Sequence, residues 1–134
     1  MEIKGDNNMI RVKYERYNCD YRRYIEEKTF RDLECLADWL FSNVNGSYKD
    51  NMFFINPDST LPYYGNELHL DSSCISTRYD SSGYETWILQ IIKDGAIIYS
   101  TGRFTNGICH WNEEVKQWLR DCRKRQLHPV FNFG

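Results

Sequence analysis

The sequence predicts a single α+β domain in which an antiparallel sheet of about five or six strands carries two amphipathic helices on one face. Short segments of alternating apolar and polar residues are separated by turn residues, and two longer segments repeat their apolar residues at helical spacing. The chain has 134 residues, the usual size of one domain, and 41% of them are hydrophobic. We therefore expect one domain over residues 9–134, preceded by a flexible N-terminus over residues 1–8.

The first predicted element is a β-hairpin. Apolar and charged residues alternate from Met9 to Glu15, which is typical of a strand with one buried face. Turn-forming residues follow at positions 18–20, and a second strand is expected over residues 21–28.

A helix is expected from Thr29, whose hydroxyl can cap the first backbone N–H groups while Asp32 stands three residues later. The apolar residues that follow repeat with a period of about 3.6. Asn45-Gly46 can adopt the left-handed backbone conformation that ends a helix. This apolar face consists of Phe30, Leu33, Leu36, Ala37, Leu40, Phe41 and Val44. Such a stripe predicts a helix packed on the core.

The middle of the chain predicts a run of short strands. Residues 84–92 form the strongest candidate, with Trp87, Leu89 and Ile91 expected on one face and Ile88 and Ile92 on the other. The next strand begins after Asp94-Gly95, a pair typical of tight hairpin turns. That strand covers residues 96–101, and the three remaining candidates cover residues 52–55, 67–70 and 74–79.

A second helix is expected to begin near Asn112, where Glu113 and Glu114 match the positive end of the helix dipole. Its buried stripe is predicted to contain Val115, Trp118, Leu119 and Cys122. Residues 130–133 follow as a possible edge strand or a source of aromatic core residues.

Charge and cysteine content narrow the function classes. The net charge of −2 is far from the basic excess of a dedicated duplex-DNA binder and from the strong acidity of a DNA mimic. The five cysteines are an odd number without C-x-x-C spacing, which favours reduced thiols in a cytoplasmic protein. The sequence contains neither an apolar run long enough to cross a membrane nor the apolar core of a signal peptide near residue 1.

Metal and catalytic motifs are weak. Cys109, His110, Cys122 and His128 are zinc-ligand types, but their spacing is irregular and Cys122 falls on the predicted helix stripe. Cys109 and His110 would point to opposite faces of a strand, and no surrounding signature supports Cys74 with His69 or His110 as a nucleophile pair. We therefore predict no catalytic residue, no metal site and no cofactor.

Two candidate surfaces remain, both rich in arginine. Interleaved Tyr and Arg can form protein-interface hot spots or stack on the bases of a single-stranded nucleic acid, although a solvated edge hairpin also explains them. The first surface, on the opening hairpin, consists of Tyr14, Arg16, Tyr17, Tyr21, Arg22, Arg23 and Tyr24. The second, at the end of the last helix, consists of Arg120, Arg123, Lys124 and Arg125, which the helix dipole also explains.

In size and aromatic-rich character the whole chain resembles the small proteins that phages and mobile elements direct against host defences, including anti-CRISPR proteins. The resemblance implies a non-catalytic inhibitor that binds a large bacterial defence nuclease by protein–protein contact. It implies no role for any particular residue. The alternatives are a single-stranded nucleic-acid-binding protein that uses the Tyr/Arg hairpin and an enzyme that uses Cys74 or Cys109.

Overall fold

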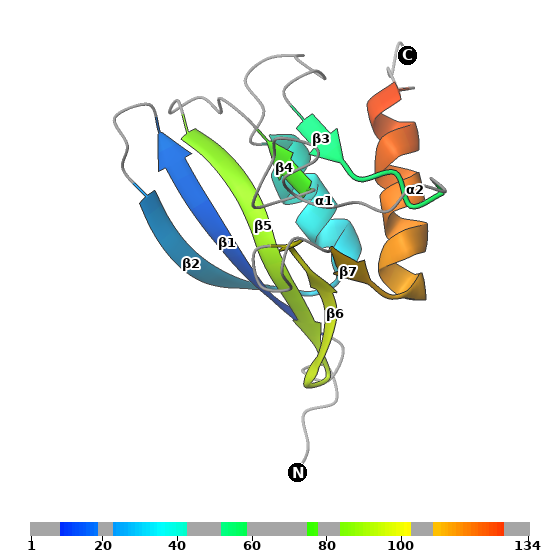
Figure 1. The fold of residues 1–134 in the computed structure, drawn as a ribbon, viewed down its shortest axis with the longest axis horizontal. Helices are drawn as coiled ribbons and strands as arrows, with labels where there is room; N and C mark the ends of the chain where they lie inside the picture. Colours follow the sequence, from blue (N-terminus) through cyan, green and yellow to red (C-terminus); the bar gives the residue numbers. More distant parts are fainter. Residues whose placement is uncertain are drawn as a thin grey trace.

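A computed structural model of the chain describes residues 9–18, 23–42, 52–58, 75–77, 84–102 and 109–127. The elements in chain order are β1 (Ile10–Asn18), β2 (Arg23–Phe30), α1 (Leu33–Ser42), β3 (Met52–Phe54), β4 (Ile75–Thr77), β5 (Tyr84–Lys93), β6 (Ala96–Ser100), β7 (His110–Trp111) and α2 (Glu113–Leu127). Figure 1 shows them as one sheet beside two helices.

The sheet has seven strands in the described part of the chain, and all its pairs are antiparallel. The long strand β5 lies at its centre. On one side β5 pairs with β1, which pairs with β2; on the other side its first half pairs with β4 and its second half with β6. The α+β prediction is confirmed, with slightly more strands than expected because the two-residue strand β7 extends the sheet beyond β6.

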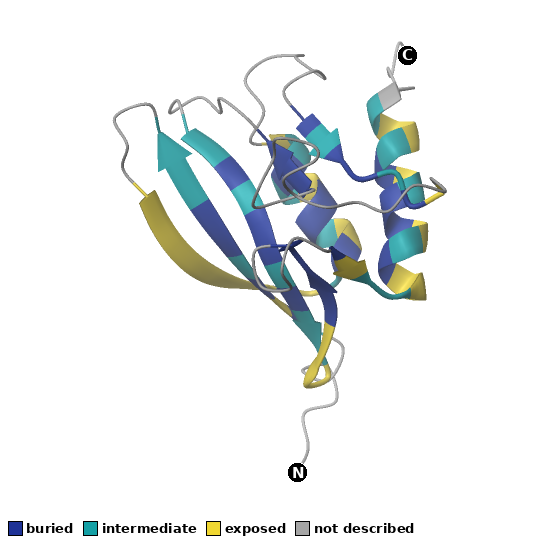
Figure 2. Cartoon of the chain, viewed as in Figure 1, coloured by how far each residue is buried: buried dark blue, intermediate teal, exposed yellow. Residues whose placement is uncertain are grey.

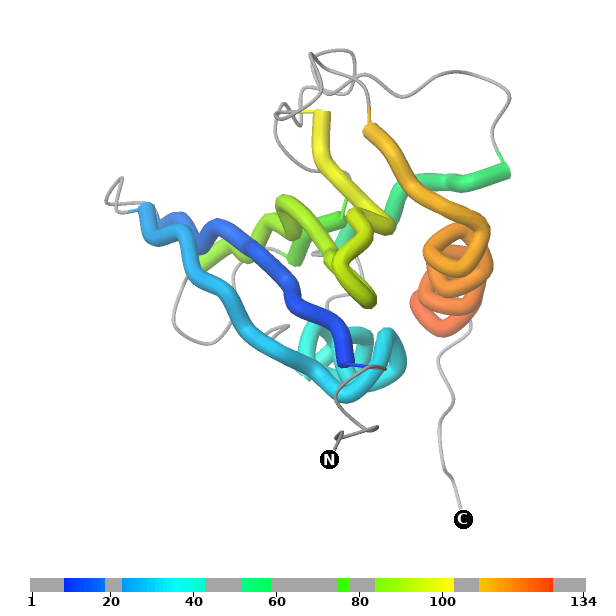
Figure 3. Tube along the Cα trace, turned by 90° about the horizontal axis from the view of Figure 1, so that it is seen from below, coloured from blue at the N-terminus to red at the C-terminus, as the bar shows by residue number. Residues whose placement is uncertain are grey.

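Both helices pack on the same face of the sheet (Figures 1 and 3). The core lies between these two layers. One cluster of buried residues joins the sheet to both helices, and Figure 2 shows buried stretches on each of these elements. Its members include Val12 of β1, Ile88 and Ile91 of β5, Leu36 of α1 and Leu119 of α2, each 0% exposed. The stripe predicted for α2 is buried in this core, as are four residues of the stripe predicted for α1, namely Leu33, Leu36, Ala37 and Leu40. Phe41 is partly buried against the core, and Val44 lies outside the described residues.

Helix α1 begins later than predicted. Thr29 and Phe30 belong to β2, where they pair with Arg11 and Ile10. Asp32 caps the helix instead: its Oδ1 accepts a hydrogen bond of 2.9 Å from the backbone N–H of Cys35. This bond holds the pKa of Asp32 below its usual value. Continued strand pairing, which buries Phe30 beside Ile10, prevails over the threonine cap.

Strand β5 does not alternate strictly as predicted. Lys13 pairs with Gln90, but the next residue, Tyr14, pairs with Ile88, so Leu89 is an extra residue in a β-bulge. The bulge changes the alternation, and Ile88 and Ile91 both oppose residues of β1 that belong to the core cluster. All three apolar residues at the bulge, Ile88, Leu89 and Ile91, are fully buried.

Two predicted boundaries are confirmed. Asp94 and Gly95 both have positive φ, 53° and 78°, as a tight hairpin turn between β5 and β6 requires. Asn112 caps α2, since its Oδ1 accepts a hydrogen bond of 2.9 Å from the N–H of Val115. Four predicted features lie outside the described residues: the N-terminus at 1–8, the helix end at 45–46, and the strand candidates at 67–70 and 130–133.

Candidate functional site

The residues of the predicted hairpin surface divide between the two faces of the sheet. Directly opposed residues in an antiparallel pair share a face. Arg16 opposes Tyr24 and Tyr14 opposes Glu26, on the face that carries the helices, whereas Tyr17 opposes Arg23 on the other face. The remaining two candidates, Tyr21 and Arg22, lie outside the described residues.

Tyr14 is a core residue. Its side chain is only 6% exposed, and its ring centroid lies 5.0 Å from that of Trp39 on α1. Burial, together with a hydrogen bond from the phenol to the carboxylate of Glu26, raises the pKa of Tyr14 to about 12. Tyr14 therefore contributes to packing and is not accessible to a partner.

The helix-side group at the end of the hairpin consists of Arg16, Tyr24 and Tyr84. The guanidinium carbon of Arg16 lies 4.8 Å from the ring centroid of Tyr84, a distance suited to a cation–π contact. The ring centroids of Tyr24 and Tyr84 are 6.1 Å apart, and Tyr24 is 42% exposed. Tyr84 was not among the predicted site residues, because only the pairing of β5 with β1 brings it beside the hairpin.

A second group lies on the opposite face of the same sheet end. The guanidinium carbon of Arg23 is 5.2 Å from the ring centroid of Tyr17, whose ring is in turn 6.1 Å from that of Trp87. The indole N–H of Trp87 donates a hydrogen bond of 2.9 Å to Glu85. An arginine, two aromatic side chains and a glutamate thus adjoin one another on this face. Trp87 is a further member, which was not among the predicted site residues.

Carboxylates accompany these arginines and aromatics. Glu15 of β1 is only 2% exposed and lies 3.5 Å from the guanidinium of Arg23, which is itself 56% exposed. A buried carboxylate needs such a partner, because an isolated buried charge is costly. The hairpin end, as we name this surface, consists of Glu15, Arg16, Tyr17, Arg23, Tyr24, Tyr84, Glu85 and Trp87.

The arginines predicted as a second surface on α2 bind other parts of the same chain. Arg120 forms an ion pair with Asp58, at 2.9 Å, and its hydrogen bonds hold the pKa of Asp58 below its usual value. Arg123 donates a hydrogen bond of 3.0 Å to the carbonyl of Phe54. These contacts fasten α2 to the end of β3 and to the segment after it.

Arg125 connects α2 to α1. Its guanidinium lies 2.9 Å from the carboxylate of Asp38 and 4.0 Å, measured from its carbon, from the ring centroid of Phe41. Lys124 is the remaining member of the predicted surface, and its side chain is exposed. Three of the four cations therefore have structural roles, which makes this surface the weaker candidate.

Two of the three cysteines that the structure describes are buried. Cys109 and Cys122 are 7% and 2% exposed, and burial raises the pKa of the Cys122 thiol. Within the described ranges no group of three or more His, Cys, Asp or Glu side chains could hold a metal ion. Cys74, His69 and His128 lie outside these ranges.

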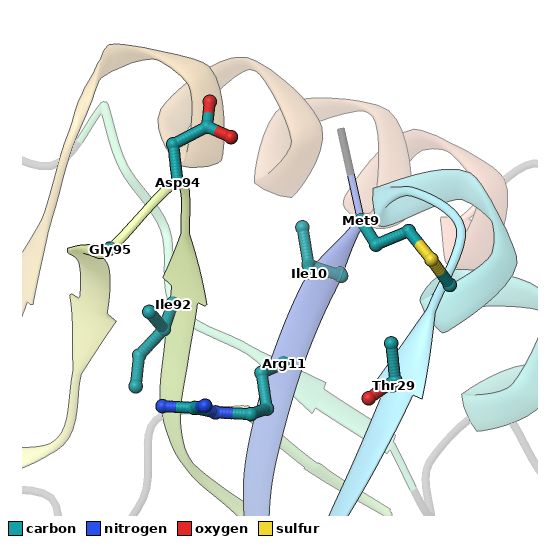
Figure 4. A pocket seen from close by; sticks show the side chains of 7 residues that line it. All are labelled: Met9, Ile10, Arg11, Thr29, Ile92, Asp94 and Gly95. Carbon is teal, nitrogen blue, oxygen red and sulfur yellow. The ribbon is translucent and has the colours of Figure 1, made fainter. Parts of the chain in front are cut away.

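A depression of about 560 Å³ lies at the other end of the hairpin, between the beginning of β1 and the β5–β6 turn. Figure 4 shows the side chain of Arg11 extending towards Ile92, with Thr29, Met9 and Asp94 around them. Arg11 lies 3.7 Å from Glu27, so its charge already has a partner. The depression is separate from the hairpin end.

No helix in the described part of the chain is long and apolar enough to cross a membrane. Comparison of the chain with models of protein families, with curated proteins and with solved structures finds no match.

Proposed function

We propose that this chain is a non-catalytic binding protein and that the hairpin end binds another protein. The observation that carries the proposal is the pair of arginine–tyrosine stacks, Arg16 on Tyr84 and Arg23 on Tyr17, at one end of the sheet. Tyr, Trp and Arg are the residues that most often dominate the affinity of protein interfaces. The stacks also hold the arginines in place, which reduces the entropy lost on binding.

The charge of the hairpin end favours a protein partner over a nucleic acid. Binding to a phosphate backbone depends on cations that replace its counterions. Here the charge of Arg23 is matched by Glu15, and Glu85 places a further carboxylate in the hairpin end. Such a mixture of donors and acceptors suits the polar groups and side chains of a protein surface.

The partner that we propose is a bacterial defence nuclease, inhibited in the cytoplasm by a protein of a phage or mobile element. The resemblance in size and character to anti-CRISPR proteins motivates this choice. The described cysteines Cys35, Cys109 and Cys122 are free thiols, as a reducing compartment would keep them.

Capture from a nuclease-treated bacterial lysate tests the proposal with a matched pair of variants. Arg23 and Arg11 lie on the same hairpin and are 56% and 57% exposed, but only Arg23 belongs to the hairpin end. Because Arg23 also faces the buried Glu15, whereas the glutamate beside Arg11 is half exposed, the melting temperature of both variants is measured first and shows that each is folded. We expect the wild type and Arg11→Ala to retain the same protein, and Arg23→Ala to retain at least about tenfold less, as for a hot spot of 1.4 kcal/mol or more. Equal retention by Arg23→Ala, or loss of the captured protein after nuclease treatment, would contradict the proposal.

The two arginine–tyrosine stacks also support single-stranded nucleic-acid binding as a second candidate. Titration of a labelled single strand at low and moderate salt separates the two candidates. The nucleic-acid candidate requires binding that weakens steeply with salt and is lost in Arg16→Ala and Arg23→Ala. The protein-binding proposal predicts no measurable complex at either salt concentration.

A further inference from the structure

Strand β2 is an exposed sheet edge. Its eight residues pair with β1 without a register shift, and in the described part of the chain β1 is its only neighbour. Seven of the eight are exposed, all except Phe30, and Figure 2 shows this along the strand. An edge strand of this kind presents a row of backbone N–H and C=O groups to which another strand can hydrogen-bond.

The sequence of β2 is complementary to itself in one antiparallel arrangement. A symmetric pair of antiparallel strands keeps each residue on its own face of the sheet, so its two-fold axis must pass beside a single residue. When that residue is Ile25, it meets Ile25 of the second copy, and Arg23 meets Glu27 on both sides of the axis. Tyr24 then meets Glu26, whose carboxylate can accept a hydrogen bond from a phenol.

Other arrangements centred on neighbouring acidic residues of β2 are unfavourable. An axis beside Glu26 or Glu27 places that glutamate opposite itself, and like charges directly opposed destabilise a sheet. The axis beside Ile25 instead covers a side chain that is 62% exposed. This arrangement also places Arg23 opposite Glu27 on both sides of the axis, and these side chains share the face of Ile25, opposite the helices.

We propose that two copies of this chain associate through β2 in an antiparallel pair centred on Ile25. The sheets then become continuous, and the two hairpin ends point in opposite directions. Arg23 and Glu27 keep their neighbours Glu15 and Arg11, at 3.5 and 3.7 Å, and gain a second opposite charge from the other copy. A single pair of strands makes a small interface, so the association is weak and depends on protein concentration.

Sedimentation equilibrium of the purified protein tests this proposal in the absence of any other partner. We expect the average mass to rise from 16.1 kDa towards twice that value as the concentration increases. Arg23→Glu and Glu27→Arg, each alone, should weaken association about tenfold, because each places two like-charged pairs across the axis. An equimolar mixture of the two variants should restore it, because the pairs between unlike copies are again opposite in charge.

Ile25→Lys gives a second test that does not depend on the ion pairs. Because Ile25 is exposed, this change leaves the monomer folded, but it brings two lysines together at the axis. A wild type that stays monomeric, an Ile25→Lys variant that associates like the wild type, or a mixture of two folded variants that associates no better than its components would overturn the proposal. The circular dichroism of each variant shows whether it is folded, because Arg23→Glu also removes the cation beside the buried Glu15. Since these measurements use only the purified chain, their failure leaves the capture experiment at the hairpin end unaffected.

Discussion

Replacement of Leu36 by Ala tests whether α1 is held by its apolar face. Leu36 is 0% exposed and belongs to the same core cluster as Val12 and Ile91 of the sheet. The change removes three carbon atoms, and at about 0.8 kcal/mol for each buried CH₂ the lost transfer energy is about 2.4 kcal/mol. The cavity left in a packed core adds to this, so we expect the free energy of unfolding to fall by about 2.5–5 kcal/mol.

Urea denaturation of the wild type, Leu36→Ala and Leu40→Ala measures this loss. Leu40 is also 0% exposed and should show a loss of the same size. Glu34→Gln is the control, because Glu34 is exposed on the same helix and its loss should cost less than about 1 kcal/mol. Losses below about 1 kcal/mol for both leucines would refute the reasoning and would place this stripe on the surface.

Three further changes test particular contacts. Asp32→Ala should lower the free energy of unfolding by about 0.5–2 kcal/mol, as for a lost helix cap, whereas Thr29→Ala should lower it clearly less. The reverse order in urea denaturation would indicate that Thr29 caps the helix. The raised pKa of Tyr14 contributes stability that is complete below pH 10.0 and is lost as the pH rises towards about 12. Tyr14→Phe should therefore flatten the decline of the melting temperature over that pH range. An unchanged decline would exclude Tyr14 as its source. The buried hydroxyl of Thr86 has no hydrogen-bond partner among the described residues. Thr86→Val should therefore leave the melting temperature unchanged or raise it, and a clear fall would reveal a bond to that hydroxyl.

The sequence predicted the elements that local patterns determine. Four buried residues of the α1 stripe, the Asp94-Gly95 turn and the cap at Asn112 depend on residues close together in the chain, and the structure confirms each. The start of α1 was predicted wrongly because Thr29 and Asp32 are both good caps, and only the pairing of Thr29 with β1 decides between them.

The composition of the candidate site could be predicted only in part. Tyr17 and Arg23 follow from the hairpin pattern, but Tyr84 and Trp87 join them through strand pairing across more than sixty positions of the chain. A strict alternation also could not reveal the bulge at Leu89 that changes the faces of β5. The helix arginines were assigned to a possible surface because their partners, among them Asp58, are remote in sequence.

Hydrogen exchange of the chain alone and in complex with a captured partner tests the central claim most directly. The account predicts slower exchange on binding at the ends of β1, β2 and β5 that form the hairpin end, over residues 14–18, 23–26 and 84–87. Helix α2, whose arginines contact other parts of the same chain, should exchange at an unchanged rate. Protection confined to α2, with none at the hairpin end, would contradict the account.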